Sequence, residues 1–221
     1  MALIVYGGAI SPFVRKVRLV MAEKGLDYTL EQVSPFSPPP EFLAISPLKR
    51  IPVLRDTDVP EPNTLPDSSI ICDYLEHKYP KPAVYPAGAF ARARALWFEE
   101  YADSVMAQNI GTGLFFERIV KKMMRGKTDE EVCRKTVSEK LPPIFDHLEG
   151  ELRTGEFMVG DFSIADIAIG TMLVNFDHAG EKIDAARWPK LAAYANRVHE
   201  RTSFKALLDE ERPLISRFRA A

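Results

Sequence analysis

A serine between a short apolar strand and a helix constrains the fold of this chain most. Residues 2–6 form an apolar, β-branched run that ends at Gly7-Gly8, which predicts a buried β-strand. Ser11 then precedes Pro12, and apolar residues recur at helical spacing until Gly25. Serine is a preferred N-cap residue, and proline suits the first helical position. The sequence therefore predicts a strand, a turn and a helix that begins directly after Ser11.

Alternating strand and helix signals continue over the first third of the chain. The expected order is strand 2–6, helix 12–24, strand 27–32, short helix 40–46, a strand from Val53, and helix 70–79. This order is typical of an α/β unit in which a βαβ motif is followed by a hairpin and a closing helix. Helical periodicity dominates beyond the proline-rich connector Lys81–Pro86. We therefore expect two domains, 1–82 and 83–221, of which the second is all-helical.

Capping signals mark the helices of the second domain. Thr128-Asp129-Glu130-Glu131 has the pattern of a capping box, and Pro142-Pro143 is expected to kink or divide the helix that it opens. Ser163 to Asp166 forms a second box, and Trp188-Pro189 starts a further helix.

Two segments of this domain depart from the helical pattern. Gly111 and Gly113 interrupt the periodicity of residues 90–124, and each glycine inside a helix costs roughly 1 kcal/mol relative to alanine. We expect these glycines to mark close packing or the floor of a pocket. Residues 215–218 are expected to form a mixed tail.

Composition limits the classes of partner. The formal net charge of −2 argues against a basic field for nucleic acid or a polybasic membrane patch. No run approaches about 18 apolar residues, and the first strand lacks a basic leader region, so a cytoplasmic protein is expected. Cys72 and Cys133 form no C-x-x-C motif, and no histidine pair has metal-ligand spacing. We therefore expect no metal; the histidines are His77, His147, His178 and His199.

Four segments of the sequence match one family. They are S-P-F-V-R-K-V-R at 11–18, S-P-L-K-R-I-P-V-L at 46–54, L-P-D-S-S-I-I-C-D-Y-L at 65–75 and G-D-F-S-I-A-D at 160–166. Over nearly its whole length the chain resembles the cytosolic glutathione transferases of the serine type. The resemblance implies a thioredoxin-like N-terminal domain that binds glutathione as co-substrate, followed by an all-α helical-bundle domain that contributes the electrophile site.

In this family a residue near the start of the first helix faces the glutathione sulfur, a role that the resemblance assigns to Ser11. Backbone N–H groups and the helix dipole leave partial positive charge there, which lowers the pKa of a thiol from about 8.5. A hydrogen bond from Ser11, worth about 1.5–3 kcal/mol, would favour the thiolate further. A plain N-cap remains the alternative role. A hydrolase nucleophile is disfavoured because no G-x-S-x-G motif occurs, and mixed-disulfide chemistry because no cysteine lies nearby.

The resemblance assigns the remainder of glutathione to two further loops. Ile51-Pro52 would contain a cis peptide bond that turns the Ile51 backbone toward the cysteinyl part of glutathione. Asp67 would meet the γ-glutamyl ammonium, and Ser68 would take the α-carboxylate at a helix N-terminus. By alignment Arg50 rather than Lys49 would hold the glycyl carboxylate, and Lys49 stands where the family commonly has glycine. The expected glutathione-binding residues are Phe13, Arg50, Ile51, Pro52, Asp67 and Ser68.

Ordinary structural roles also fit these loop residues. Proline is common at the start of a strand, Arg50 is an ordinary loop charge, and Asp67, Ser68 or Ser69 would each cap a helix. The second substrate would lie over apolar side chains that are equally candidates for the core. These are Ile10, Phe13, Phe36, Met106, Ile110 and Phe116.

The favoured function is conjugation of the glutathione thiolate to small apolar electrophiles, as in detoxification. A glutathione-dependent peroxidase, dehalogenase or isomerase on the same fold is one alternative, although the S-S-C-S turn of the maleylacetoacetate isomerase type is absent. A non-catalytic binding or regulatory protein is another. The family also implies a homodimer.

Overall fold

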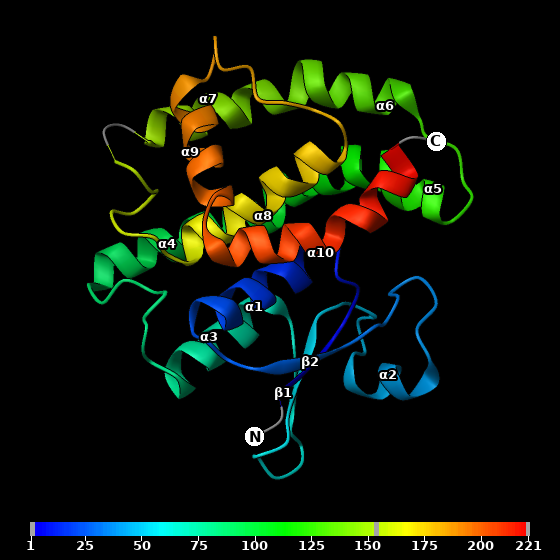
Figure 1. Cartoon of the computed structure of the whole chain (residues 1–221), viewed down its shortest axis with the longest axis vertical. Helices are drawn as coiled ribbons and strands as arrows, with labels where there is room; N and C mark the ends of the chain where they lie inside the picture. The colour runs from blue at the N-terminus through cyan, green and yellow to red at the C-terminus, as the bar shows by residue number, and fades with distance from the viewer. Residues whose placement is uncertain (1–2, 153–154, 220–221) are drawn as a thin grey trace. The chain divides into compact units, whose positions relative to one another are not determined.

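The computed structural model describes residues 3–152 and 155–219. The chain divides into two units, Met1–Val84 and Tyr85–Ala221. The first is a thioredoxin-like α/β unit and the second is all-helical, as the sequence predicted (Figure 1). Among the described residues no helix combines the length and the apolar character needed to cross a membrane.

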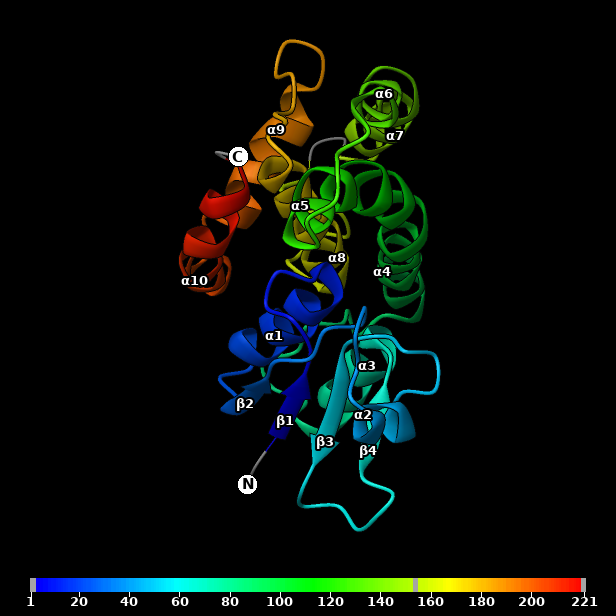
Figure 2. The same cartoon turned by 90° about the vertical axis from the view of Figure 1, so that its right-hand side faces the viewer.

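A four-stranded mixed sheet with the order β2-β1-β3-β4 forms the centre of the first unit (Figure 2). β1 (Leu3–Tyr6) pairs in parallel with β2 (Tyr28–Glu31) and antiparallel with β3 (Val53–Asp56). β4 (Thr64–Pro66) pairs antiparallel with β3. Because α1 (Pro12–Glu23) joins the two parallel strands, the predicted βαβ motif and hairpin are confirmed.

Helices cover both faces of this sheet. Side chains alternate along a strand, so Tyr6 and its neighbour Val53 point to one face, where they pack against Phe42 of α2 (Pro40–Ile45). The other face is covered by α3 (Ser68–Lys78), which contacts β3 and packs against α1. Figure 1 shows α1 and α3 together, away from α2.

The second unit is built around α8 (Ile164–His178), nearly all of whose residues are buried. Figure 1 shows α8 at the centre of the helices, and it contacts both α4 and η1. The remaining elements are α4 (Ala89–Tyr101), η1 (Ala102–Val120), α5 (Lys121–Met123), α6 (Glu130–Lys135), η2 (Thr136–Lys140), α7 (Leu141–Glu151), α9 (Pro189–His199) and α10 (Thr202–Arg219).

The helix does not break at Gly111 and Gly113, contrary to the expected interruption. α4, η1 and α5 follow one another without a gap, and η1 has the wider turn of a π-helix. Gly113 marks a close approach, because an added Cβ would lie 2.7 Å from Thr136 Oγ1. Close packing, one of the two roles expected of these glycines, is therefore confirmed at Gly113.

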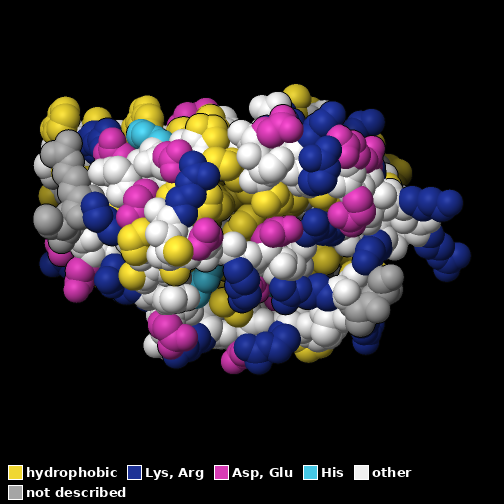
Figure 3. Space-filling view, turned by 90° about the horizontal axis from the view of Figure 1, so that it is seen from above, with side chains coloured by type: hydrophobic (Ala, Val, Ile, Leu, Met, Phe, Trp, Pro, Cys, Tyr) yellow, Lys and Arg dark blue, Asp and Glu magenta, His cyan; other side chains and the backbone are white. Residues whose placement is uncertain are grey.

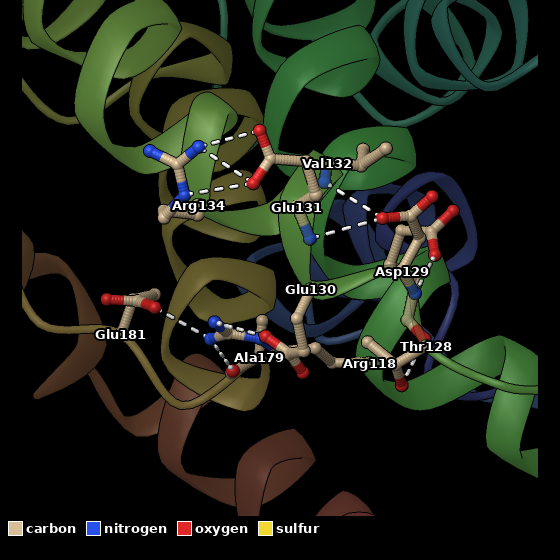
Figure 4. A network of polar contacts seen from close by, with 10 residues as sticks. Arg118, Thr128, Asp129, Glu130, Glu131, Val132, Arg134, Ala179 and Glu181 are labelled. Carbon is tan, nitrogen blue, oxygen red and sulfur yellow. Dashed lines mark hydrogen bonds and ion pairs between the residues drawn. The ribbon is translucent and has the colours of Figure 1, made fainter.

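Asp129 rather than Thr128 caps α6 (Figure 4). Its carboxylate accepts hydrogen bonds from the backbone N–H groups of Glu131 and Val132, both at 3.1 Å. The Thr128 hydroxyl instead donates to the Glu117 carbonyl at 3.0 Å, so it is turned away from the helix start. The cap therefore lies one residue later than predicted.

Four other sequence expectations for this unit can be compared with the structure. The helical run that begins with α6 is divided as expected, because η2 ends at Lys140 and α7 begins at Leu141, directly before Pro142 and Pro143. The predicted capping box at Ser163 and the helix start at Trp188 are confirmed. Residues 215–218 are helical rather than a mixed tail, because α10 buries one face at helical spacing through Phe204, Leu207, Glu211 and Ile215.

Candidate functional site

Three loops meet at one end of the sheet. In the strand register Tyr6 of β1 lies beside Val53 of β3, which lies beside Pro66 of β4. The turn before α1 leaves the sheet at Tyr6, the loop before β3 enters at Val53, and the turn before α3 leaves at Pro66. Neighbouring strands lie about 4.8 Å apart, so the loops span roughly 10 Å, the length of an extended tripeptide. The three loops that the family resemblance singled out are thus brought together.

Ser11 is the N-cap of α1, as predicted. Its backbone is extended, and its Oγ accepts a hydrogen bond from the Val14 N–H at 3.5 Å. This bond uses the oxygen and leaves the hydroxyl hydrogen without an acceptor among the described residues. The half-buried side chain can therefore donate to a ligand atom at the positive end of α1. Its role toward sulfur stays a prediction.

The Ile51–Pro52 peptide bond is cis, as the resemblance implied. Pro52 is buried, and Ile51 lies directly beside the end of β1. A Cβ added to Gly7 would lie 3.3 Å from Ile51 Cβ and 2.5 Å from Val14 Cγ2. Glycine at position 7 therefore lets the turn before α1 and the loop before β3 approach each other closely.

Asp67 combines a capping role with an unusual backbone. Its Oδ1 accepts hydrogen bonds from the N–H groups of Ser69 at 2.9 Å and Ile70 at 3.4 Å. Its φ of +81° and ψ of 131° lie in a region that non-glycine residues rarely adopt. Residues with such backbone angles are concentrated at functional sites. The residue is exposed, and Oδ2 has no hydrogen-bond partner among the described residues. Ser68, which follows, is buried in the first turn of α3.

Lys49 and Arg50 lie exposed in the loop before β3. Lys49 has a φ of +56°, a left-handed conformation that explains why glycine suits this position. The backbone of Arg50 is held from both sides, because its N–H donates to Ser46 Oγ at 3.1 Å and its carbonyl accepts from the same hydroxyl at 2.7 Å. Neither cation forms an ion pair with a described residue, and the preference for Arg50 stays a prediction.

Sequence reasoning missed a buried lysine between two of these loops. Lys16 of α1 is fully buried, and its Nζ donates to Ser69 Oγ at 3.0 Å. The bond connects α1 to the first turn of α3, and the ammonium adds positive charge beside that helix start. The available signal is that the positions three and four residues away from Lys16 on either side are apolar, namely Pro12, Phe13, Leu19 and Val20.

The residues expected to line an electrophile pocket are divided between the two units. In the first unit Ile10 and Phe13 are half-buried, whereas Phe36 is 54% exposed. In the second, Phe116 is half-buried, and full burial of Met106 and Ile110 favours a packing role for both. A shared pocket stays a prediction.

The described histidine, cysteine and acidic side chains are the candidates for metal and thiol chemistry. Residues 3–152 and 155–219 contain no group of three or more His, Cys, Asp or Glu side chains that could hold a metal ion. Cys72 and Cys133 are buried free thiols. Burial raises the pKa of the Cys133 thiol, which makes it a poor thiolate nucleophile.

Comparison with known proteins agrees with this fold. Residues 5–83 match the glutathione S-transferase N-terminal domain, and residues 128–197 match the glutathione S-transferase C-terminal domain. A stringent starvation protein A homologue of Pasteurella multocida is 30% identical over 206 residues, 91% of this chain and 87% of that protein. Glutathione S-transferase 3 of Zea mays is 32% identical over 152 residues, 66% of this chain and 65% of that one.

A solved structure extends the likeness to three dimensions. The crystal structure of a glutathione S-transferase from Rhodospirillum rubrum F11 matches with a TM-score of 0.84 at 27% identity, covering 93% of this chain and 91% of that one. The matched domains, the similar sequences and the similar structure all indicate the same family. This chain therefore belongs to the glutathione S-transferase family.

Proposed function

We propose that this chain binds glutathione where the three loops meet and holds its sulfur as a thiolate for transfer to small apolar electrophiles. The observation that carries the proposal is the Ser11 hydroxyl, which caps α1 and still has a hydrogen to donate. A sulfur placed there receives that hydrogen bond and the positive end of α1, and both stabilise its anionic form.

The other loops supply one contact for each charged group of glutathione. Oδ2 of Asp67 faces the γ-glutamyl ammonium, and the start of α3 at Ser68 takes the α-carboxylate. The Ile51 backbone pairs with the cysteinyl residue beside Pro52, as in strand addition. Arg50 holds the glycyl carboxylate. Phe13, beside Ser11, completes the assigned contacts.

The chemical step is a nucleophilic displacement or addition. The thiolate donates an electron pair to an electrophilic carbon, and a C–S bond forms. In a displacement the leaving group departs with the electrons of the broken bond; in an addition the π electrons move to the neighbouring atom, which takes a proton from water. Holding both reactants together contributes several kcal/mol to the rate, whereas one hydroxyl hydrogen bond contributes about 1.5–3 kcal/mol. Loss of Ser11 should therefore impair the reaction without abolishing it.

The decisive experiment is an ultraviolet difference titration of bound glutathione against pH. We expect a thiolate to form near neutral pH in the wild type and about one to two pH units higher in Ser11→Gly. Glycine is nearly as good an N-cap as serine, so this variant removes the hydroxyl with little change in stability. Ser216→Ala, which removes an exposed hydroxyl bonded to Pro213 O in α10, is the control and should titrate as the wild type.

Two outcomes would contradict the proposal in different ways. Bound glutathione with an unshifted thiol in the wild type would reduce Ser11 to a helix cap. Absence of glutathione binding would support the second candidate function, a non-catalytic regulatory protein. That candidate is favoured by the alignment of stringent starvation protein A homologues over most of the chain.

The proposal also covers the cellular location, the oligomeric state and the biological role of the chain. We infer a cytoplasmic homodimer that acts in detoxification, and sedimentation at micromolar concentration tests the dimer. Product analysis over a panel of halides, peroxides and isomerisable substrates separates conjugation from the peroxidase, dehalogenase and isomerase alternatives, all of which would use the same thiolate.

A further inference from the structure

An open hollow of about 470 Å³ lies on the surface of the helical unit, between the loop after α5 and the last turns of α10. Four basic side chains line it, namely Lys122, Arg125, Lys127 and Arg217. Lys122 joins the two walls, because its Nζ donates to the Phe218 carbonyl at 3.2 Å. Figure 1 shows α5 beside the end of α10, and Figure 3 shows Lys and Arg side chains projecting at that end of the unit.

These four cations are not neutralised by the described part of the protein. None of them forms an ion pair with a described acidic residue. The nearby carboxylates have other partners. Glu130 and Glu181 pair with Arg118, and Asp129 caps α6 (Figure 4). Glu117 pairs with Lys121. Like charges around one hollow repel each other, so a bound anion would relieve that repulsion.

Helix termini explain only part of this cluster. The helix that ends in α5 and the end of α10 both present carbonyl groups, and basic residues are favoured there. Each helix end is equivalent to about half a negative charge. Two ends therefore offset about one of the four positive charges, and most of the charge remains.

Arg125 adds a second observation, which is independent of charge. The helix ends in a Schellman arrangement, in which Gly126 N–H donates to Lys121 O at 2.7 Å and Arg125 N–H donates to Lys122 O at 3.0 Å. Arg125 occupies the left-handed position, with a φ of +59°, that glycine normally takes. The chain thus holds an arginine at the hollow in an unfavourable conformation, although a glycine follows directly, and such residues are concentrated at functional sites.

We propose that this hollow binds a small molecule that carries a di- or triphosphate group. Lysine and arginine are the side chains best suited to phosphate oxygens, and the volume falls in the range of small-ligand pockets. A nucleic acid fits less well, because the formal net charge is −2 and acidic side chains are interspersed with basic ones over the face seen in Figure 3. The site is separate from the proposed glutathione site, which lies in the first unit.

Calorimetric titration of the full chain with inorganic tripolyphosphate tests the proposal. We expect saturable binding that weakens as salt is raised. Arg125→Gly and Arg217→Gln should each weaken it by about tenfold or more. Arg125→Gly should also raise the melting temperature, because glycine suits the left-handed position, so lost binding cannot be ascribed to unfolding. The control is Arg212→Gln, an α10 arginine that pairs with Asp209 outside the hollow and should leave binding unchanged.

Several results would overturn the assignment. They are no saturable binding at low salt, equal affinity in the wild type and Arg125→Gly, or an oligonucleotide or anionic vesicle that binds more tightly than tripolyphosphate. Ser11→Gly should bind tripolyphosphate as the wild type does, which keeps this test distinct from the test of glutathione activation.

Discussion

Asp67 and Asp166 both lie at the start of a helix, but their carboxylates are used differently. Asp67 is exposed, and only its Oδ1 has described partners, the first backbone N–H groups of α3. Asp166 is fully buried in the first turn of α8, and both of its oxygens accept hydrogen bonds. The donors are Met158 N–H, Tyr194 Oη–H, Ser163 N–H and Ser163 Oγ–H, at 2.9 to 3.3 Å.

The difference separates a structural carboxylate from one available to a ligand. Asp166 has four donors and is buried, so it connects α8 to the preceding loop and to α9 through Tyr194. Asp67 has an oxygen without a described partner and a strained backbone, which are features of a binding site. Asp67 is the N-cap of α3 and Asp166 is the third helical residue of α8, so an aspartate at a helix start can be exposed in one unit and buried in the other.

Replacement of each aspartate by alanine should give the largest contrast. Asp166→Ala leaves several buried donors without an acceptor, and we expect the free energy of unfolding to fall by about 4 kcal/mol. Asp67→Ala removes only an exposed cap and should cost about 1 kcal/mol. Urea denaturation of both variants measures the two losses. Equal losses would contradict the distinction between the two sites.

The stability of the chain should depend on pH through Asp166. Burial raises the pKa of Asp166 to about 6 despite its four donors. Between about pH 4 and 6 the folded chain keeps a proton that the unfolded chain has released, so stability falls as pH rises through this window, by about 3 kcal/mol. Asp166→Asn cannot titrate and should lack this decrease. The measurement is the difference in unfolding free energy between wild type and Asp166→Asn at pH 4 and pH 7, and a constant difference would refute it.

Most of the fold was predictable because its signals are local. The strand at Leu3–Tyr6, the Ser11 cap and the Ser163 box each depend on residues that are close together in the sequence. The predictions failed where contacts with residues distant in the sequence determine the local structure. The helix continues through Gly113, where Thr136 packs closely against it. Thr128 does not cap α6 because its hydroxyl donates a hydrogen bond to the Glu117 carbonyl.

The site was only partly predictable from the sequence. The family resemblance identified the three loops, but their convergence depends on strand register between residues far apart in the chain. The positive φ of Asp67 has no local signature, since an aspartate before a helix is expected to be an ordinary cap. The apolar positions around Lys16 indicate that it is buried but do not identify Ser69 as its partner. Unusual backbone angles at single positions can be identified only from the three-dimensional structure.

The smallest effect should come from Asp67→Gly, which separates backbone strain from ligand contact. Glycine adopts a φ of +81° without strain and is only a few tenths of a kcal/mol worse than aspartate as a cap. Stability should therefore stay unchanged or rise by up to about 1 kcal/mol, whereas Asp67→Ala loses about that amount. If Asp67 binds the γ-glutamyl ammonium as proposed, both variants should bind glutathione about tenfold more weakly, because each lacks the carboxylate. Denaturation and calorimetry of the two variants test this. Equal destabilisation would show that the Asp67 backbone is unstrained, and unchanged affinity would remove Asp67 from the glutathione site.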